Sequence, residues 1–330
     1  MKTRLKIIFV SLLAILAIFI YIRKSEEKYM AYVPNASDGT ITIIDTTSDE
    51  IIDEIKVGDS VSHGIAVSND GSKIYTGNLE NGQVFIIDVK SKEIIKTINT
   101  GRNLHGIDIT PDGKYVFTTS GDLQEGEEFN YINIIDTNSD EVIKTIQSNG
   151  KSPSHVDFTK DSKIAFVNNV MSGNITVVDM KKFEIVSTID VGIMPNESEL
   201  SPDDKYLYVA NVQDGTISIV DVNKRKEIDR LKVGEGTHGI AVSKDGRYVW
   251  TTNRFSNDVS VIDIEKKEIV KSIVTNGQAN HISVLPNSNY AYVSNLESED
   301  ISIIDMKSFE IVKTIKVGKE PHEIEFVKVN

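Results

Sequence analysis

The chain has 330 residues, 39% apolar and 26% charged, a composition that supports a large buried core and excludes a disordered protein. Because it contains no cysteine, disulfides, thiolate metal ligands, a cysteine nucleophile and a covalently attached c-type haem are excluded. The formal net charge is −13 and no basic stripe with interleaved aromatic residues is present, so we expect no nucleic-acid partner.

The N-terminal segment differs from the rest of the chain. Residues 7–22 form an uncharged apolar run with basic residues on both sides. This run is long for a signal-peptide core and slightly short for a spanning helix, and no small-residue cleavage site follows it. We therefore predict that residues 1–28 are an uncleaved single-pass signal anchor with a short linker, and that residues 29–330 are a separate domain. The basic flanks are balanced, so charge alone does not fix the orientation.

One unit is repeated seven times through residues 29–330. Its most regular mark is an aspartate at the end of a β-branched run, which recurs every 42 to 48 residues. These aspartates are Asp45, Asp88, Asp136, Asp179, Asp221, Asp263 and Asp305. A strand-rich period near this length is typical of a four-stranded propeller blade. Each aspartate precedes a turn, so we interpret it as a turn cap.

The two ends of the repeat region complement each other. The segment from His322 to the C-terminus supplies one strand of the first type, and residues 31–35 supply one of the second type. Pairing them closes a seventh blade and leaves no open sheet edge. We therefore predict an all-β fold, a seven-bladed β-propeller with four-stranded blades closed by the N- and C-terminal strands and preceded by one membrane-anchor helix. Trp250, within a second-type strand, is expected to pack between blades.

Short runs in the second strands carry a family resemblance. YVPN at 32–35, YVAN at 208–211, YVSN at 292–295 and WTTN at 250–253 resemble the YVTN-type β-propeller repeat, over residues 29–330. That family includes surface-layer proteins and exported propellers of unknown role, which implies a location outside the cytoplasm. Similar propellers form the haem-binding domain of cytochrome-cd-type nitrite reductases and the copper-cluster domain of nitrous-oxide reductase.

All six histidines lie four or five residues after the glycine that ends a fourth strand, and Asn196 takes this place in the remaining blade. They are His63, His105, His155, His238, His281 and His322. Because the first strand of each blade lines the channel, we expect a ring of histidines at one mouth. Three interpretations stay open. One is a structural ring that bonds to the adjoining turns, another is a metal or haem site, since imidazole is the commonest metal ligand, and the last is a site for an organic ligand or anion.

The expected width of the channel limits the metal interpretation. Packed sheets suggest a ring radius of up to about 11 Å, too wide for one ion to be reached by all six imidazoles. An ion on a subset of neighbouring blades or a metal cluster stays open, with copper suited to all-nitrogen ligation. Haem lying across the mouth on one axial histidine is the other version.

Other residues near the ring are candidate ligand-binding residues. Beside Asn196, Glu197 is a candidate carboxylate ligand, and Arg102 and Arg254 are candidates for holding an anion at the same opening. Simple surface charge is the alternative for all three charged residues. An acidic loop at residues 121–130 is expected to hang over the ring.

The sequence contains no nucleophile elbow, Walker loop, dinucleotide fingerprint or zinc-protease motif, so no motif predicts an enzyme. The leading hypothesis is a membrane-anchored extracytoplasmic scaffold that binds a protein, polymer or small molecule on its channel face. The alternative is a copper- or haem-binding propeller with a redox or cofactor-accessory role. A lactonase-like hydrolase ranks last, because such propellers gather acidic metal ligands where this chain has histidines.

Overall fold

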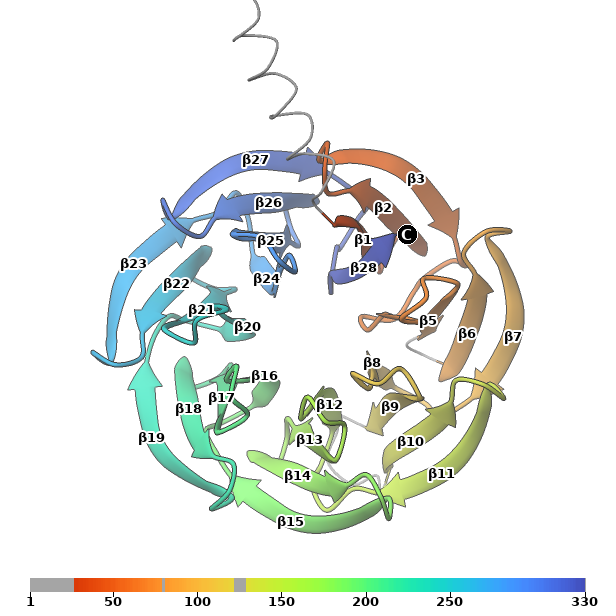
Figure 1. The fold of residues 1–330 in the computed structure, drawn as a ribbon, viewed down its shortest axis with the longest axis horizontal. Coiled ribbons are helices and arrows are strands. Elements are labelled where there is room, and N and C mark those ends of the chain that lie inside the picture. Colours follow the sequence, from red (N-terminus) through yellow and green to blue (C-terminus); the bar gives the residue numbers. More distant parts are fainter. Residues whose placement is uncertain (1–26, 79–80, 122–128, 330) are drawn as a thin grey trace, which may run out of the picture.

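A computed structural model describes residues 27–78, 81–121 and 129–329. Within these ranges the chain forms seven four-stranded antiparallel sheets, arranged as blades around a central channel (Figure 1). The prediction of a seven-bladed all-β propeller is confirmed. The predicted anchor helix and most of the acidic loop lie outside the described residues, so the division at residue 28 stays a prediction. No helix long and apolar enough to cross a membrane occurs in the described ranges.

Blades 1 to 7 are numbered in chain order of their first strands, which line the channel, while the fourth strands form the outer rim (Figure 1). The first strands are β4 (Ala66–Val67), β8 (Leu104–Ile109), β12 (Pro153–Phe158), β16 (Pro195–Leu200), β20 (Thr237–Val242), β24 (Ala279–Val284) and β28 (Glu325–Val329). The second strands are β5 (Lys73–Asn78), β9 (Tyr115–Gly121), β13 (Ile164–Asn169), β17 (Tyr206–Asn211), β21 (Tyr248–Asn253), β25 (Tyr290–Asn295) and β1 (Lys28–Asn35).

The third and fourth strands of each blade are joined by a tight turn. The third strands are β6 (Gln83–Asp88), β10 (Asn130–Asp136), β14 (Asn174–Asp179), β18 (Thr216–Asp221), β22 (Asp258–Asp263), β26 (Asp300–Asp305) and β2 (Thr40–Asp45). The fourth strands are β7 (Glu93–Asn99), β11 (Glu141–Gln147), β15 (Glu184–Asp190), β19 (Lys226–Lys232), β23 (Glu268–Val274), β27 (Glu310–Lys316) and β3 (Glu50–Lys56).

Blade 7 closes the circle by pairing the two ends of the described chain. β28 pairs antiparallel with β1, from Lys28 opposite Val329 to Tyr32 opposite Glu325, and β1 continues through β2 to β3. This confirms the predicted closure, although β1 begins three residues before the predicted start at residue 31. Every first strand therefore has a blade neighbour on both sides, and the channel wall is continuous.

The turn between the third and fourth strands is built in the same way in all seven blades. The aspartate that ends each third strand accepts a hydrogen bond from a backbone N–H two or three residues later. In blade 2, for example, Asp136 Oδ1 lies 2.9 Å from the backbone nitrogen of Ser139. The predicted role of these aspartates as turn caps is confirmed.

The core lies between the blades, where each sheet packs on the next. Trp250 of β21 is fully buried and shares a hydrophobic cluster with Ala279, Ile282 and Val293 of the following blade. The predicted place of this tryptophan between blades is confirmed. Such packing fixes each first strand against its neighbours and so determines where the channel side chains lie.

Candidate functional site

In several blades the pairing of the first strand with the second strand is irregular at the residues that line the channel. In blade 2, Leu104 is opposite Ser120 and the next pair is Ile107 with Thr118, so two residues of β8 oppose one of β9. This is a β-bulge, and blades 3, 5 and 6 have the same irregularity. A bulge re-aims side chains, and here it brings two successive residues of each strand to the channel.

Three layers of channel residues follow from this register. The outer histidine layer is formed by His63, His105, Ser154, Asn196, His238, Asn280 and His322. The inner layer, one residue further on, is formed by Gly64, Gly106, His155, Glu197, Gly239, His281 and Glu323. The acidic layer, two residues beyond that, is formed by Ala66, Asp108, Asp157, Glu199, Ala241, Ser283 and Glu325.

The prediction that all six histidines share one repeat position is therefore wrong for His155 and His281. Both lie in the inner layer, one residue further along the strand than the other four. The spacing from the preceding glycine could not reveal this, because the connection from fourth to first strand varies in length by one residue. In blades 3 and 6 the corresponding outer positions are Ser154 and Asn280.

The imidazoles fill the centre of the channel. Ring centroids are 3.8 Å apart for His63 and His322, which are stacked, and 4.8 Å apart for His238 and His281. His155 and His281, from blades that are not neighbours, are 5.1 Å apart. The predicted ring radius of up to about 11 Å would hold the imidazoles further apart than these distances. It is based on the spacing of whole packed sheets, and the first strands pack more closely than whole sheets do.

Burial keeps most of these imidazoles neutral. It lowers the pKa of His63 to about 3, with smaller contributions from the charges of His281, Arg254 and His155. Burial likewise lowers the pKa of each of the following histidines well below the usual value. They are His105, His238, His281 and His322. Neutral imidazole is the form that binds a metal ion.

Glycine occupies the inner layer in blades 1, 2 and 5, and the packing requires it. A Cβ on Gly64 would lie 2.4 Å from the backbone nitrogen of Ile107, and one on Gly106 would lie 2.6 Å from the backbone oxygen of Ser154. In blade 5, a Cβ on Gly239 would lie 2.7 Å from the backbone oxygen of Asn280. Adjacent first strands are thus in backbone contact here, and the absence of side chains leaves the centre to His155 and His281.

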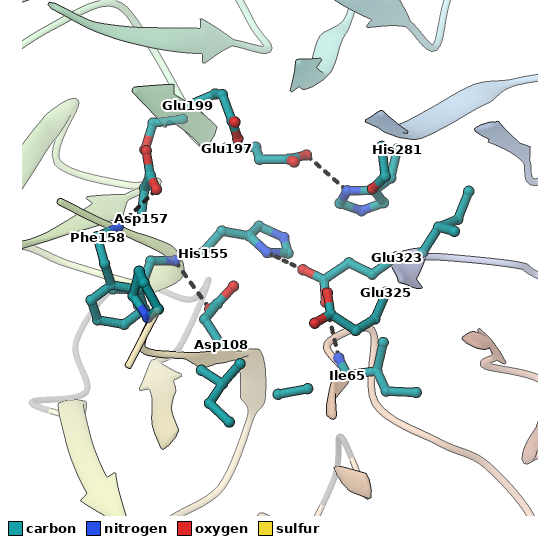
Figure 2. Close-up of a pocket in the computed structure, with 17 residues that line it drawn as sticks. Ile65, Asp108, His155, Asp157, Phe158, Glu197, Glu199, His281, Glu323 and Glu325 are labelled. Atoms are coloured by element: carbon teal, nitrogen blue, oxygen red, sulfur yellow. Dashed lines mark hydrogen bonds and ion pairs between the residues drawn. The ribbon is translucent and has the colours of Figure 1, made fainter. Parts of the chain in front are cut away.

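Two histidine–carboxylate pairs cross the channel in the inner layer (Figure 2). His155 Nδ1 lies 2.5 Å from Glu323 Oε1, and His281 Nδ1 lies 2.8 Å from Glu197 Oε2. The other oxygen of Glu323 accepts a hydrogen bond of 2.9 Å from the backbone nitrogen of Ile65. Burial raises the pKa of Glu197 to about 7 and raises that of Glu323 well above its usual value.

Beside these pairs lies a cavity of about 260 Å³ with an acidic lining (Figure 2). Its carboxylates are those of Asp108, Asp157, Glu197, Glu199, Glu323 and Glu325. Burial raises the pKa of Asp157 to about 7 and that of Glu325 to about 8, and the charge of Glu323 adds to the shift of Glu325. Like carboxylates that share one site resist ionising together, so a cation entering the cavity would be stabilised.

Sequence reasoning found Glu197 but missed the other carboxylates. The signal was present in the alternation of acidic residues along a first strand, Glu197 with Glu199 and Glu323 with Glu325. Alternate residues of a strand lie on the same face of the sheet, and in the first strands that face borders the channel.

The structure brings three of the four predicted ligand-binding residues to the channel. Glu197 is in the inner layer, and Asn196 Nδ2 is 3.4 Å from His238 Nδ1 in the outer layer. Arg254 follows β21, and its Nε donates to Asn280 Oδ1 at 2.8 Å. Burial lowers the pKa of Arg254 to about 10, while Glu197 opposes that shift. Arg102 is exposed instead, with its guanidinium 5.1 Å from the ring centroid of Phe129.

Two of the four outer histidines bond across blades, whereas His105 Nδ1 is buried with no hydrogen-bond partner among the described residues. His238 Nδ1 is 3.3 Å from the backbone oxygen of Asn280, and His322 Nδ1 is 3.0 Å from Asn280 Nδ2. These partners belong to adjacent first strands and not to the turn that precedes each histidine. A structural contribution of the outer layer would therefore act between blades.

Comparison with known proteins agrees with this architecture. Residues 30–328 match the YNCE-like beta-propeller family. The chain belongs to this family. No curated protein matches its sequence. The family assignment covers almost all of the described residues and agrees with the blade count.

Solved structures resemble this YNCE-like propeller in fold. Hydrazine synthase of Kuenenia stuttgartiensis is similar with a TM-score of 0.73 and 21% identity, over 83% of this chain and 91% of that chain. A functionally unknown protein from Desulfotomaculum acetoxidans DSM 771 is similar with a TM-score of 0.77 and 15% identity, over 91% and 99%. Dihydro-haem d1 dehydrogenase NirN in complex with DHE is similar with a TM-score of 0.66 and 20% identity, over 87% and 63%. At these identities the likeness concerns the fold alone.

Proposed function

We propose that this protein is a membrane-anchored, extracytoplasmic binding protein that holds a cationic ligand in the central channel of its propeller. The observation that carries the proposal is the cavity of about 260 Å³ lined by six carboxylates. Gathering carboxylates around one cavity without a compensating cation is costly, and perturbed acids gathered in one cavity are typical of functional sites.

The distribution of charge along the channel supports a direction of entry. Arg254 contacts Asn280 of the outer histidine layer, so its positive charge lies at that end. The acidic layer contributes Asp108, Asp157, Glu199 and Glu325 on the other side of the inner layer. A cation is repelled from the end that carries Arg254 and attracted to the end that carries the acidic layer. The acidic layer therefore concentrates it at the cavity.

Binding of simple cations to the full chain in detergent tests the proposal. Isothermal titration with Zn²⁺ and, separately, with 1,4-diaminobutane should detect saturable binding of at least one of them. Replacing Glu199 and Glu325 together by glutamine should weaken that binding, because two of the attracting carboxylates are lost. If neither cation binds the unaltered protein, the channel is not a cation site.

The anchor and the extracytoplasmic location rest on the sequence of residues 1–28 and on the family resemblance. We expect the full chain to sediment with membranes and to resist alkaline extraction. A Leu13→Arg variant should partition to the soluble fraction, since an arginine near the centre of a membrane helix costs about 2.5–3.5 kcal/mol. If added protease digests the propeller only after the membrane that carries the anchor is broken, the extracytoplasmic location is contradicted.

Haem is the second candidate, favoured by the likeness to NirN in complex with DHE. The channel interior does not fit it, because pockets for ligands of that size are mostly apolar and about 300–1,000 Å³ in volume. The carboxylates of the cavity would also repel the propionates of a haem. A haem across the outer histidine layer would be bound by His63 or His105, which are half-buried. The purified protein would then show an intense visible band, and replacing either histidine by alanine would change that band. If the protein binds added haem and neither substitution changes the visible band, this candidate is excluded.

A further inference from the structure

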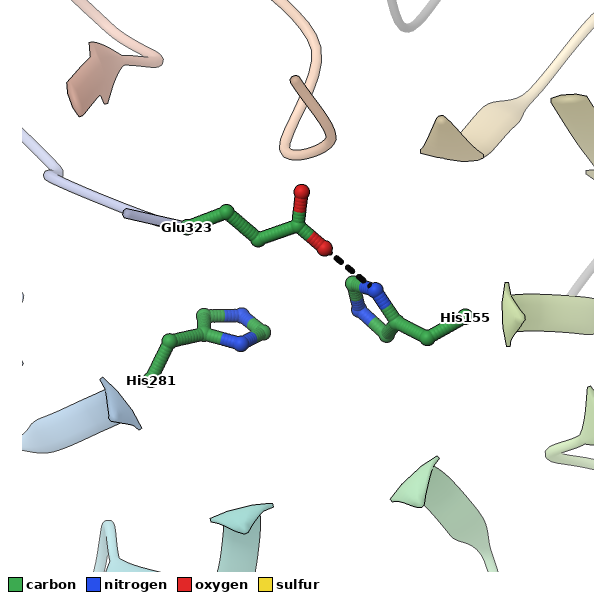
Figure 3. Close-up of side chains that lie close together, drawn as sticks. All are labelled: His155, His281 and Glu323. Carbon is green, nitrogen blue, oxygen red and sulfur yellow. Dashed lines mark ion pairs between the residues drawn. The ribbon is translucent and has the colours of Figure 1, made fainter. Parts of the chain in front are cut away.

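We propose that the cation is a divalent first-row transition metal ion, bound in the inner layer by His155, His281 and Glu323. This inference rests on the proposed function, because it names the ligand that the channel holds. It also differs from the sequence expectation of an ion on neighbouring blades, since the three residues come from blades 3, 6 and 7 and meet across the axis. Figure 3 shows the three side chains pointing toward one another.

The first observation is the convergence of the donor atoms. One ligand atom from each of the three residues lies within 4.8 Å of the others. Donors bound to one Zn²⁺ at about 2.0–2.2 Å are roughly 3.3–3.6 Å apart in a tetrahedron. Side-chain shifts of about 1 Å therefore complete the site, and no first strand has to move.

The second observation is an unsatisfied nitrogen within the cluster. His155 is only 3% exposed, its Nδ1 contacts Glu323, and its Nε2 is buried with no hydrogen-bond partner among the described residues. Leaving a buried polar atom without a partner costs free energy. A metal ion bound at Nε2 removes that cost, whereas an ion bound at Nδ1 takes the place of the contact with the carboxylate.

The third observation is the support of the ligands by neighbouring groups. Glu197 Oε2 lies 2.8 Å from His281 Nδ1, and a carboxylate on one ring nitrogen orients the other nitrogen toward a metal. The backbone nitrogen of Ile65 holds the second oxygen of Glu323. Glu197 is thus a positioning residue for His281, and the carboxylate of Glu323 is fixed at one end.

The chemistry of the donors selects the class of ion. Two imidazole nitrogens and one carboxylate oxygen suit Zn²⁺, Cu²⁺, Fe²⁺ or Ni²⁺, whereas Mg²⁺ and Ca²⁺ prefer all-oxygen sites. The set is mixed, so it does not match the all-nitrogen copper site considered from the sequence. The remaining carboxylates of the cavity balance the charge of a dication before it reaches the inner layer.

Titration of the chelator-treated full chain with Zn²⁺ tests the inference. We expect one Zn²⁺ per chain that excess Mg²⁺ or Ca²⁺ does not displace. His155→Ala and His281→Ala should each weaken binding more than about 100-fold, and Glu197→Gln about 10–100-fold, as is usual for a residue that supports a ligand. His63→Ala, which removes an imidazole outside the cluster, should leave the affinity unchanged.

Unchanged Zn²⁺ affinity in both cluster variants, or equal loss in His63→Ala, would overturn the inference. Because a buried histidine variant can fail to fold, X-ray absorption at the zinc edge of the unaltered protein gives a second readout. Scattering from two imidazoles is expected, and scattering from none or from four also overturns the assignment. If 1,4-diaminobutane binds and Zn²⁺ does not, this inference fails while the proposed function stands; if neither binds, both fail.

Discussion

The rim and the channel wall of this propeller are built from the same repeats but use them differently. At the rim, all seven blades carry an aspartate that caps the turn between the third and fourth strands. In the channel, corresponding positions hold histidine, serine, asparagine, glycine, alanine, aspartate or glutamate. The repeated residues build the frame, and the departures from the repeat gather at the axis, where the candidate site lies.

The largest effect is expected in the channel, where backbones touch. In Gly106→Ala the new Cβ would meet the backbone oxygen of Ser154 at 2.6 Å, so we expect a loss of about 1–3 kcal/mol in stability. Thermal unfolding followed by the fluorescence of Trp250, the single tryptophan, measures this. The matched control is Gly58→Ala, whose Cβ meets only the Ser60 oxygen at 3.6 Å and should change stability by less than about 0.5 kcal/mol. Equal melting temperatures for the two variants would contradict the described contact between blades 2 and 3.

A smaller effect is expected at the rim. Asp136→Ala removes the acceptor of the bonds from Asn138 and Ser139 and should cost about 1 kcal/mol, the net value of a typical hydrogen bond. Asp136→Asn keeps an acceptor oxygen and should retain most of that stability. Zn²⁺ binding should be unchanged in both variants. A rim variant that alters Zn²⁺ affinity would show that the turns at the rim influence the candidate site in the channel.

The smallest effect concerns acid pH at the exposed turn between the first and second strands of blade 1. Hydrogen bonds from Ser68 and Ser72 lower the pKa of Asp70 from 3.8 to about 2. The stability contributed by Asp70 is therefore fully present above pH 3.8 and is lost as pH falls through about 2. The melting temperature of Asp70→Asn should fall less than that of the unaltered protein between pH 5 and pH 2. A parallel fall in the two proteins would mean that this turn does not contribute.

The fold was predictable because the repeat consists of turn residues and β-branched runs, whose structural preferences depend mainly on neighbouring residues in the sequence. Asp136 and its six counterparts cap turns as expected, and Trp250 lies between blades as expected. Closure followed from strand types at the two ends. None of these inferences needs to place a residue more accurately than within its strand.

The candidate site was only partly predictable because it depends on single-residue register. At the bulge of their strands His155 and His281 are the second of the two extra residues, whereas His105 and His238 are the first. The spacing from the preceding glycine does not show this one-residue difference. The carboxylates Glu199 and Glu325 resemble surface residues in composition, and only the closed circle places them around one cavity.

The closure of blade 7 has a consequence for how the site is assembled. Glu323 lies just before β28, which pairs with β1 across nearly the full length of the described chain. During synthesis, His155 and His281 emerge from the ribosome before this glutamate, so a partly made propeller offers only two of the three proposed ligands. Capture of the ion is thereby delayed until the final strand has docked, and nascent or truncated chains are left without a complete binding centre.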